Sequence, residues 1–551
     1  TFARFLWINK CMRTKDLIEK RKRRERKHMR SQKNNTVKQQ VVETSVKEKY
    51  VLPADFPEEV LAELKHLPRF ISSEEILRRR DMRDILTFTI DPEDAKDFDD
   101  ALSFVTLDNG NYQIGIHIAD VTHYVPEGSA VDEEAYQRGT SIYLVDRVIP
   151  MLPERLCNEL CSLRPHEDKA CMSVIVEMDA HAKVVRHKIC RTVICSDYRL
   201  TYQQAQQYIE GNITDSTHDS ENLSHVLPLL NKLAQQLRSK RFERGAINFE
   251  TPEVRFRLDD DGNPIEILFR QLTDANHLIE EFMLLANRIV AKEIGVKAKD
   301  DHESSQPDKP FVYRIHDVPD PEKIAKLGTF IRQLGFQLRT SSKRSVQNKH
   351  INSLLDSCQG TNSQTLIETL TIRSMSKAVY STSNIGHYGL AFPYYTHFTS
   401  PIRRYPDMMV HRLLSKYLLQ SKVPCRHDKE VLEEACVHCS DTEQMAQMAE
   451  RDSIKEMQAR WISQHLGETF EGVISGVTEF GLFVQLRDTM TEGLVPIRTI
   501  EPHDYMQYDE DNYCLIAARS GKTYTLSDSV RVRVVKADVE RKQIDFVLVE
   551  E

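Results

Sequence analysis

The fold of this chain is organised around the stretch Asp91-Pro92-Glu93-Asp94-Ala95-Lys96-Asp97-Phe98-Asp99-Asp100. Six of its ten residues are acidic, and one is a lysine. Strand-like apolar runs flank it: residues 85–90 come before, and residues 101–105 and 112–118 come after, with Asn109-Gly110 as the turn of a hairpin. The sequence therefore predicts an acidic loop at the end of buried strands.

Such a group of carboxylates needs a counter-charge. Two carboxylates about 4 Å apart repel each other by roughly 4 kcal/mol at an effective dielectric constant of 20. Either some of them bind protons, or a divalent cation lies among them. Mg2+ suits oxygen ligands and keeps open positions for phosphate oxygens. An EF-hand calcium loop is excluded because Lys96 and Leu102 stand where glycine and glutamate are needed. The alternative is a solvated acidic loop without a metal.

The composition indicates a globular chain of more than one domain. The chain has 551 residues, of which 29% are charged and 40% hydrophobic. No apolar run approaches the ~18 residues of a membrane span, and the apolar start at residues 1–7 is too short for a secretory signal. We therefore expect a cytoplasmic protein that contacts no membrane. The missing initiator methionine indicates a fragment or a processed chain.

The cysteine content is also consistent with a cytoplasmic protein, and the charge is unevenly distributed along the chain. The 11 cysteines are scattered and odd in number, which favours reduced thiols. The motif Cys436-Val437-His438-Cys439 lacks a second pair, so buried thiols are a better interpretation than a zinc site. The net charge is −8, but residues 1–50 carry 16 Lys/Arg and 5 Asp/Glu, or +11, which leaves −19 on the rest. RNA contacts would therefore come from local basic patches and metals.

The run from Thr89 to Leu102 resembles the catalytic signature of the RNB family of exoribonucleases, the ribonuclease II and ribonuclease R group. Ribonuclease R is the nearer match. The likeness extends from about residue 50 to the C-terminus, and its other motifs lie at residues 115–121, 139–143, 148–153 and 397–405. The resemblance implies a magnesium-dependent, processive 3′-to-5′ exoribonuclease that releases 5′-mononucleotides.

The resemblance also implies the catalytic residues. Asp91, Asp97, Asp99 and Asp100 match the four catalytic aspartates of the family, which implies that they hold Mg2+, with Mn2+ as a substitute. We expect Asp99 to matter most. Two such ions can activate water and stabilise the leaving oxygen.

Two arginines follow in the motif around residue 400. Pro406 favours the first turn of a helix, so Arg403 and Arg404 are expected in the irregular segment before it. Arg403 matches the family's catalytic arginine, and its guanidinium suits a scissile phosphate. Arg404 either binds RNA or pairs with Asp407.

Three further residues are candidates for RNA contacts. Tyr143 matches the aromatic residue that stacks on the terminal nucleotide. Phe249 is expected near the second stacking ring, although it could equally be a core residue. Glu281 is assigned to the terminal ribose by resemblance, whereas the sequence alone describes it as an exposed helix residue.

The last part of the chain changes to short strands with glycines at bends, which predicts an OB-fold barrel. The expected strands are residues 470–477, 481–486, 493–495, 530–535 and 543–547. The first two resemble the RNA-binding domain of the ribosomal S-one type. Phe480, Phe483 and His503 are candidates for stacking on bases. The alternative for the two phenylalanines is barrel core, because a barrel buries alternate residues.

We therefore predict an α+β chain: a mixed α/β RNB catalytic domain followed by a C-terminal OB-fold barrel. The expected parts are a basic N-terminal arm at 1–50, a connector at 51–84, the catalytic domain at 85–420, its helical extension at 421–466 and the OB-fold RNA-binding domain at 467–551. The arm is either a solvated charge run or a non-specific phosphate clamp. The cold-shock-type domains usual in the family are not visible.

The expected partner is RNA with a single-stranded 3′ end, and the resemblance suggests the ribosome and RNA-decay factors as further partners of a monomer. Three alternatives stay open. They are a ribonuclease II-like enzyme that is limited to single strands, a catalytically inactive RNA-binding protein, and a structural or metal-storing acidic loop. The complete aspartate set and Arg403 argue against inactivity, and the last alternative gives Arg403 and the barrel no role.

Overall fold

The computed structural model describes residues 50, 52–53, 55–212, 218–248, 253–295, 309–339, 348–361, 363–419, 426–509 and 513–549. The predicted α+β architecture is confirmed: a mixed sheet with helices is followed by a closed barrel. The predicted N-terminal arm lies almost wholly outside the described residues.

The central sheet has seven strands in the order β1-β8-β7-β4-β3-β2-β9. Its four inner pairings, from β8 to β2, are antiparallel, whereas the edge strands β1 and β9 pair in parallel. The strands are Arg80–Asp81 (β1), Thr87–Asp91 (β2), Asp100–Thr106 (β3), Tyr112–Ala119 (β4), Asp168–Met178 (β7), Val184–Cys195 (β8) and Tyr198–Thr201 (β9). Because β2 ends at Asp91 and β3 begins at Asp100, the acidic loop joins two neighbouring strands of the sheet, and the predicted hairpin of β3 and β4 is confirmed.

A buried polar network holds β3 in this sheet. The His117 ring on β4 lies 2.8 Å from the Ser103 hydroxyl on β3 and 2.7 Å from the Ser173 hydroxyl on β7. Ser173 in turn hydrogen-bonds Thr192 on β8. Burial lowers the pKa of His117 to about 3, so the ring is neutral and can both donate and accept. The network fixes the register of the strand that presents Asp100.

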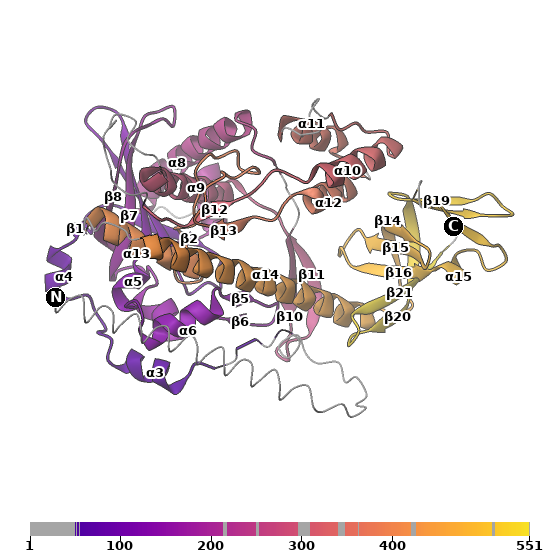
Figure 1. Ribbon diagram of the computed structural model, residues 1–551, viewed down its shortest axis with the longest axis horizontal. Helices are drawn as coiled ribbons and strands as arrows, with labels where there is room; N and C mark the ends of the chain where they lie inside the picture. The colour runs from indigo at the N-terminus through magenta and orange to yellow at the C-terminus, as the bar shows by residue number, and fades with distance from the viewer. Residues whose placement is uncertain are drawn as a thin grey trace. The chain divides into compact units, whose positions relative to one another are not determined.

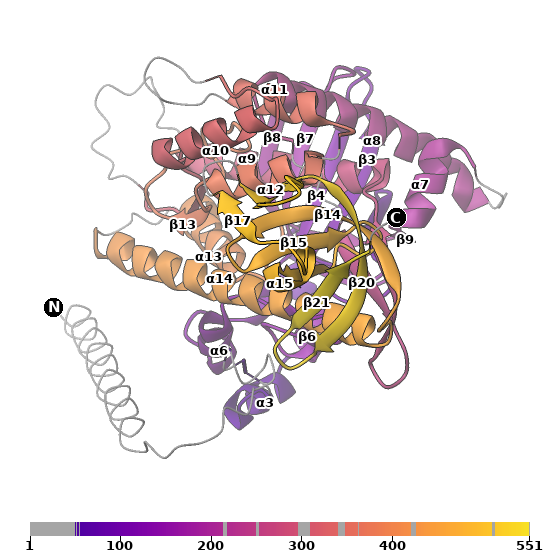
Figure 2. The ribbon, with the colours of Figure 1, turned by 90° about the vertical axis from the view of Figure 1, so that its right-hand side faces the viewer.

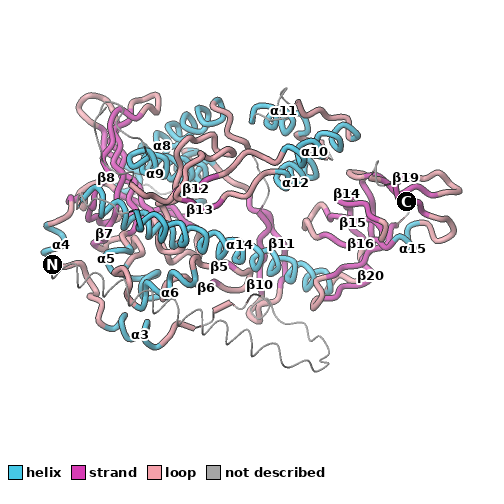
Figure 3. Tube along the Cα trace, in the orientation of Figure 1, coloured by secondary structure: helices cyan, strands magenta, loops and turns pink. Residues whose placement is uncertain are grey.

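Helices pack on this sheet (Figure 1). The predicted helices at 225–242 and 274–294 are α8 (His218–Glu243) and α9 (Asp274–Gly295), and α9 contacts β4 and β7. Helices α10, α11 and α12 form a group in which α12 contacts both α10 and α11 (Figure 3). The other helices of this part are α3 (Glu58–Lys65), α4 (Ser73–Leu77), α5 (Val121–Tyr124), α6 (Ala130–Arg138), η1 (Arg155–Leu160), α7 (Tyr202–Glu210), α10 (Pro321–Gln333), α11 (Asn348–Cys358), α12 (Gln364–Ser374), α13 (Tyr405–Leu414) and η2 (Ser415–Leu419).

Three two-stranded elements complete this part: β5 with β6, β10 with β11, and β12 with β13. The predicted turn at 260–263 lies between β10 and β11. The strand predicted at 247–249 is wrong for its described residues, because Ile247 and Asn248 are irregular and the Ile247 N–H donates to the Gly389 carbonyl. The strands are Ile142–Tyr143 (β5), Val148–Ile149 (β6), Glu253–Leu258 (β10), Pro264–Arg270 (β11), Tyr313–Ile315 (β12) and Val379–Ser381 (β13).

Helix α14 (Arg426–Ser463) contacts α13 and β13 as well as barrel strands β20 and β21. The barrel closes in the order β14-β15-β16-β21-β20 (Figure 2), so all five predicted strands are confirmed. A three-stranded sheet inserted between β16 and β20 was not predicted. The strands are Thr469–Thr478 (β14), Gly481–Leu486 (β15), Glu492–Pro496 (β16), Met506–Asp509 (β17), Cys514–Ala517 (β18), Thr523–Thr525 (β19), Ser529–Asp538 (β20) and Gln543–Leu548 (β21), with the short helix Ile497–Ile500 (α15).

Two expectations from composition can be compared with the described residues. Cys436 and Cys439 are buried free thiols on α14, as the sequence predicts. Among the helices that the structure describes, none combines the length and the apolar character needed to cross a bilayer.

Substituting Gly115 should test the polar network. A Cβ at Gly115 would lie closer than 3.0 Å to both the Ser103 hydroxyl and the His117 ring, so Gly115→Ala should break their hydrogen bond. We expect the free energy of unfolding to fall by about 1–3 kcal/mol in urea titrations. Gly328→Ala is the matched control, because its Cβ meets nothing within 4 Å inside α10, and it should raise stability by about 0.5–1 kcal/mol. Equal effects of the two substitutions would contradict the role of the network.

Candidate active site

The acidic loop, residues 91–100, is held by main-chain contacts. The Phe98 N–H donates to the Ser162 hydroxyl, which donates in turn to the Lys96 carbonyl. The Asp99 carbonyl accepts from the Ala119 N–H at 2.9 Å. At the start of the loop, Arg199 on β9 donates to the carbonyls of residues 92 and 93 at 2.7 Å. The loop is thus anchored at both ends while its carboxylates stay free of these contacts.

Three of the four predicted aspartates lie where their charge is costly. Asp91 ends β2, Asp100 begins β3, and Asp99 is only 4% exposed. Burial raises the pKa of Asp99 well above its usual value, and burial together with repulsion from Asp100 does the same for Asp91. Burial raises the pKa of Asp100 to about 6. The structure therefore brings these predicted carboxylates together in an environment that disfavours their charge.

The donor set fits a hard cation. One carboxylate oxygen each of Asp91 and Asp99 is buried without a hydrogen-bond partner. Within the described ranges, no group of three or more His, Cys, Asp or Glu side chains is arranged to hold a metal ion. Mg2+ is usually held by one or two carboxylates, with waters and substrate phosphates as its other ligands. The two unpartnered oxygens match that pattern.

Residues 400–404, which we call the arginine turn, lie against the acidic loop. The Ile402 N–H donates to one Asp99 oxygen at 2.9 Å, and the Arg403 Nε lies 3.5 Å from the other. The Arg403 side chain is 42% exposed, so it faces both the carboxylates and solvent. Helix α13 begins at Tyr405, which confirms the irregular segment predicted before it.

The Arg404 side chain has a different partner from that of Arg403. Its Nη2 donates to Asp407 Oδ1 at 2.8 Å, and the Asp407 side chain is fully buried. The predicted alternative for Arg404, an ion pair with Asp407, is therefore confirmed.

Tyr143 lies at the edge of the same site. Its ring is partly exposed, its hydroxyl lies 3.5 Å from an Asp97 oxygen, and its main-chain N–H donates to Glu450 on α14 at 3.0 Å. Burial raises the pKa of Glu450. The structure thus brings Tyr143 and Asp97 together, with a carboxylate from α14 behind them.

Two further candidates of the mixed part are Glu281 and Phe249. Glu281 is 3% exposed and accepts from the Arg241 Nε at 3.0 Å, so the description of an exposed helix residue is wrong. The pattern of apolar residues on α9 does not predict the burial of Glu281, because that burial depends on Arg241, which lies on another helix. Phe249 lies outside the described residues.

The barrel aromatics differ in exposure. Phe480 is 65% exposed at the turn between β14 and β15, whereas Phe483 is half-buried on β15 opposite Gly476. His503 is exposed in a turn that follows α15. Phe480 is therefore available for stacking, and Phe483 is neither fully exposed nor fully buried.

Sequence reasoning missed Arg199, Ser162 and Glu450. None of them belongs to a local motif, and each reaches the site from a distant segment. The parallel pairing of β9 with β2 brings Arg199 to the site, the course of α14 brings Glu450, and Ser162 comes from the segment after η1. The sequence carries no short-range signal for such contacts.

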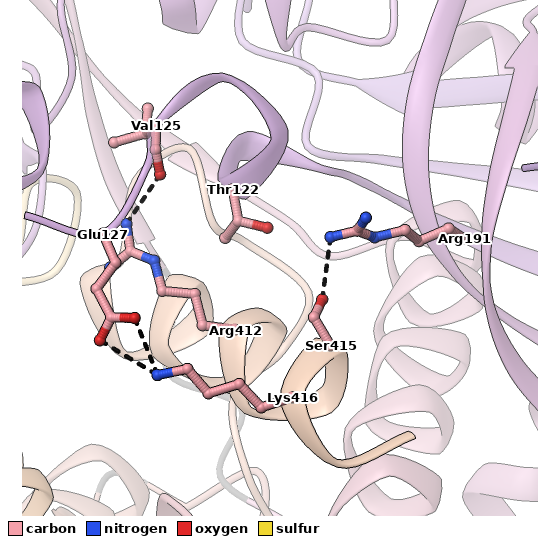
Figure 4. A pocket seen from close by; sticks show the side chains of 7 residues that line it. All are labelled: Thr122, Val125, Glu127, Arg191, Arg412, Ser415 and Lys416. Atoms are coloured by element: carbon pink, nitrogen blue, oxygen red, sulfur yellow. Dashed lines mark hydrogen bonds and ion pairs between the residues drawn. The ribbon is translucent and has the colours of Figure 1, made fainter. Parts of the chain in front are cut away.

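A small hollow lies at the other end of α13 (Figure 4). Its volume is about 230 Å³, and Arg191, Arg412 and Lys416 line it. Each cation has a carboxylate within ion-pair distance: Asp120, Asp132 and Glu127, respectively. Because each cation is paired, the hollow is a contact between α13 and its neighbours rather than a free anion-binding site.

Comparison with known proteins agrees with this geometry. The RNB domain model matches residues 79–420, which is more than half of the chain, and the S1 RNA binding domain model matches residues 463–548. Ribonuclease R of Thermotoga maritima is 43% identical over 504 residues, which cover 91% of this chain and 69% of that protein.

Solved structures give the same relationship. The structure of Mycoplasma genitalium RNase R in complex with ribose-methylated single-stranded RNA matches with a TM-score of 0.83 at 27% identity, over 92% of this chain and 77% of that one. The same enzyme in complex with double-stranded RNA matches with a TM-score of 0.78 at 26% identity, over 92% and 82% of the two chains. The chain therefore belongs to the RNB family, among the ribonuclease R proteins, and is a 3′-to-5′ exoribonuclease.

Proposed function

We propose that the chain hydrolyses RNA processively from a single-stranded 3′ end, releases 5′-mononucleotides and depends on Mg2+. One observation carries this proposal: buried carboxylates with unpartnered oxygens lie opposite the exposed guanidinium of Arg403. A cation stabilises like charges in such a place without their taking up protons, and a cation beside an arginine suits a phosphate. We expect the enzyme to act as a cytoplasmic monomer.

The carboxylates of the acidic loop are the candidate ligands of the cation. They are Asp91, Asp97, Asp99 and Asp100, and the unpartnered oxygens of Asp91 and Asp99 are the ones that would bind it directly. Bound Mg2+ supplies a Lewis acid for the phosphate oxygens and lowers the pKa of a coordinated water.

Arg403 neutralises the charge that grows on the phosphate during displacement. Tyr143 stacks on the terminal base without reading its identity, and this places the last phosphodiester over the carboxylates. These contacts hold the end of a strand rather than its middle, in keeping with exonucleolytic action.

A larger hollow provides a path for RNA. Its volume is about 1030 Å³, and it lies between β11, α12, α14 and barrel strands β14 and β15. Arg373, Lys455 and Arg487 line it together with Phe269. Cations interleaved with an aromatic ring are the usual means of binding single strands without sequence preference. We propose that the strand contacts this wall on its way to the acidic loop.

The activity depends on the carboxylate that contacts the arginine turn. Asp99→Asn should lower kcat on a 3′-labelled single-stranded RNA by at least about 100-fold, because it removes a charged ligand while keeping the shape of the side chain. RNA affinity in a filter-binding assay should stay near that of the parent. Turnover by Asp99→Asn at the rate of the parent would reject the proposal, and RNA binding without turnover by the parent would support an inactive binding protein.

Structured RNA separates the two enzymatic candidates. The relative from Mycoplasma genitalium is seen with double-stranded RNA, so we expect a hairpin with a 3′ overhang to be degraded through its stem. Gel analysis of products over time measures this, with a blunt hairpin as the control that offers no single-stranded 3′ end. Products that stop at the stem would instead identify an enzyme limited to single strands.

Acid should weaken cation binding. The pKa of Asp100 in the folded protein, about 6, lies above its value of about 3.9 in an unfolded chain, so the folded state takes up a proton as the pH falls through 6. In the absence of metal, Asp100 therefore reduces stability above pH 6, and the reduction disappears toward pH 4. Asp100→Asn should raise the melting temperature of metal-free protein at pH 7.5 and much less at pH 4.5.

Magnesium titrations followed by thermal shift complete this test. For the parent, the concentration giving half-maximal stabilisation should rise as the pH falls from 7.5 to 5.5, because protons compete with the cation. A titration that is independent of pH, with no effect of Asp100→Asn on melting, would contradict the assignment.

A further inference from the structure

The arginine turn is held on its outer side by the segment that leads to Tyr143. The Arg403 carbonyl accepts from the Thr140 hydroxyl at 3.0 Å and from the Ser141 N–H at 2.9 Å. The Tyr405 N–H donates to the Gly139 carbonyl at 3.0 Å. These contacts fix the main chain around Arg403 but do not close the turn.

The Arg403 and Arg404 N–H groups donate to the Ser400 carbonyl at 3.3 and 3.0 Å. One buried carboxylate, that of Asp407, completes the closure. Asp407 Oδ1 accepts from the Ser400 N–H at 2.8 Å and from the Arg404 Nη2 at 2.8 Å. The first and the last residue of the turn are therefore tied to one oxygen in the first turn of α13. Asp407 also lies near the positive end of that helix, where a carboxylate is stabilised.

The two arginines of the turn face different surroundings. The Arg403 side chain is 42% exposed, and its Nη2 donates to the Ser400 hydroxyl at 3.0 Å beside Asp99. The Arg404 side chain is 19% exposed. Burial by itself would lower the pKa of Arg404, but the charge and hydrogen bond of Asp407, together with Tyr380 and Tyr395, offset this, so the pKa lies above its usual value. Arg404 is thus a largely buried cation that is paired with Asp407 through Nη2, while its Nε has no hydrogen-bond partner.

We infer that Asp407 is a positioning residue for RNA hydrolysis: together with Arg404 it closes the arginine turn and thereby sets Arg403 against Asp99. Arg404 acts through Asp407 and does not bind RNA. The inference rests on the proposed role of Arg403 at the scissile phosphate. Small displacements at such a group have large effects, since a shift of about 1 Å can lower a rate by about 100-fold.

Asp407→Asn tests the positioning role in the full chain. The amide keeps an oxygen for the Ser400 N–H but leaves Arg404 with no opposite charge. We expect kcat on single-stranded RNA to fall by about 100-fold while the Kd for RNA stays unchanged. The control is Glu177→Gln, which neutralises a 7%-exposed carboxylate paired with Arg186 at the far end of β7. That control should lower the melting temperature but keep kcat.

A double variant distinguishes positioning from a general loss of stability. Removing both partners is commonly less harmful than stranding one buried charge. Asp407→Asn combined with Arg404→Met should therefore recover part of the kcat that Asp407→Asn loses. Circular dichroism and melting temperature establish that each variant folds.

Salt dependence tests the role given to Arg404. A phosphate contact contributes about 0.7 to the slope of log K against log salt concentration for a single strand. Arg404→Met should leave that slope and the Kd unchanged while lowering kcat, whereas Arg403→Met should reduce the slope. A reduced slope with Arg404→Met, or the parent's kcat with Asp407→Asn, would overturn the inference. If Arg403→Met itself kept the parent's kcat, the proposed function of Arg403 would fail instead.

Discussion

Burial of several carboxylates in one loop is the constraint on which the rest of the mixed part depends. Hydrogen bonds to the main chain of the loop hold its shape: Ser162 and Ala119 contact its end, and Arg199 contacts its start. Arg403, 3.5 Å from Asp99, supplies an opposite charge. Two acidic oxygens keep no hydrogen-bond partner. The loop is therefore rigid and electrostatically unfavourable at once, a combination typical of sites that give up stability for function.

The adjacent arginines show how one residue type serves two purposes. Exposure separates them: Arg403 faces the carboxylates and solvent, while Arg404 is paired with the buried Asp407. Their order follows from the start of α13, since the residue before a helix has an extended backbone and its neighbour then points to the other side. A charged pair in a motif is thus not by itself evidence for two ligand contacts.

Periodic features could be predicted from the sequence, whereas contacts between distant segments could not. The acidic loop, the hairpin after it, helix α9 and the five barrel strands each carry a local pattern. The burial of Glu281 depends on Arg241, 40 residues away on another helix, and Glu450 reaches Tyr143 from 307 residues away. The sheet of β17 to β19 was missed because its strands are only three or four residues long.

The length of helix α14 connects the barrel mechanically to the mixed part. At 38 residues it is about 57 Å long, and it contacts β13 as well as barrel strand β20. Along its length Glu450 and Ser453 accept hydrogen bonds from the N–H groups of residues 143 and 145. In the proposed function, a force that the RNA exerts on the barrel would therefore be transmitted along this helix to the backbone of residues 143–145, beside the ring proposed to stack on the terminal base.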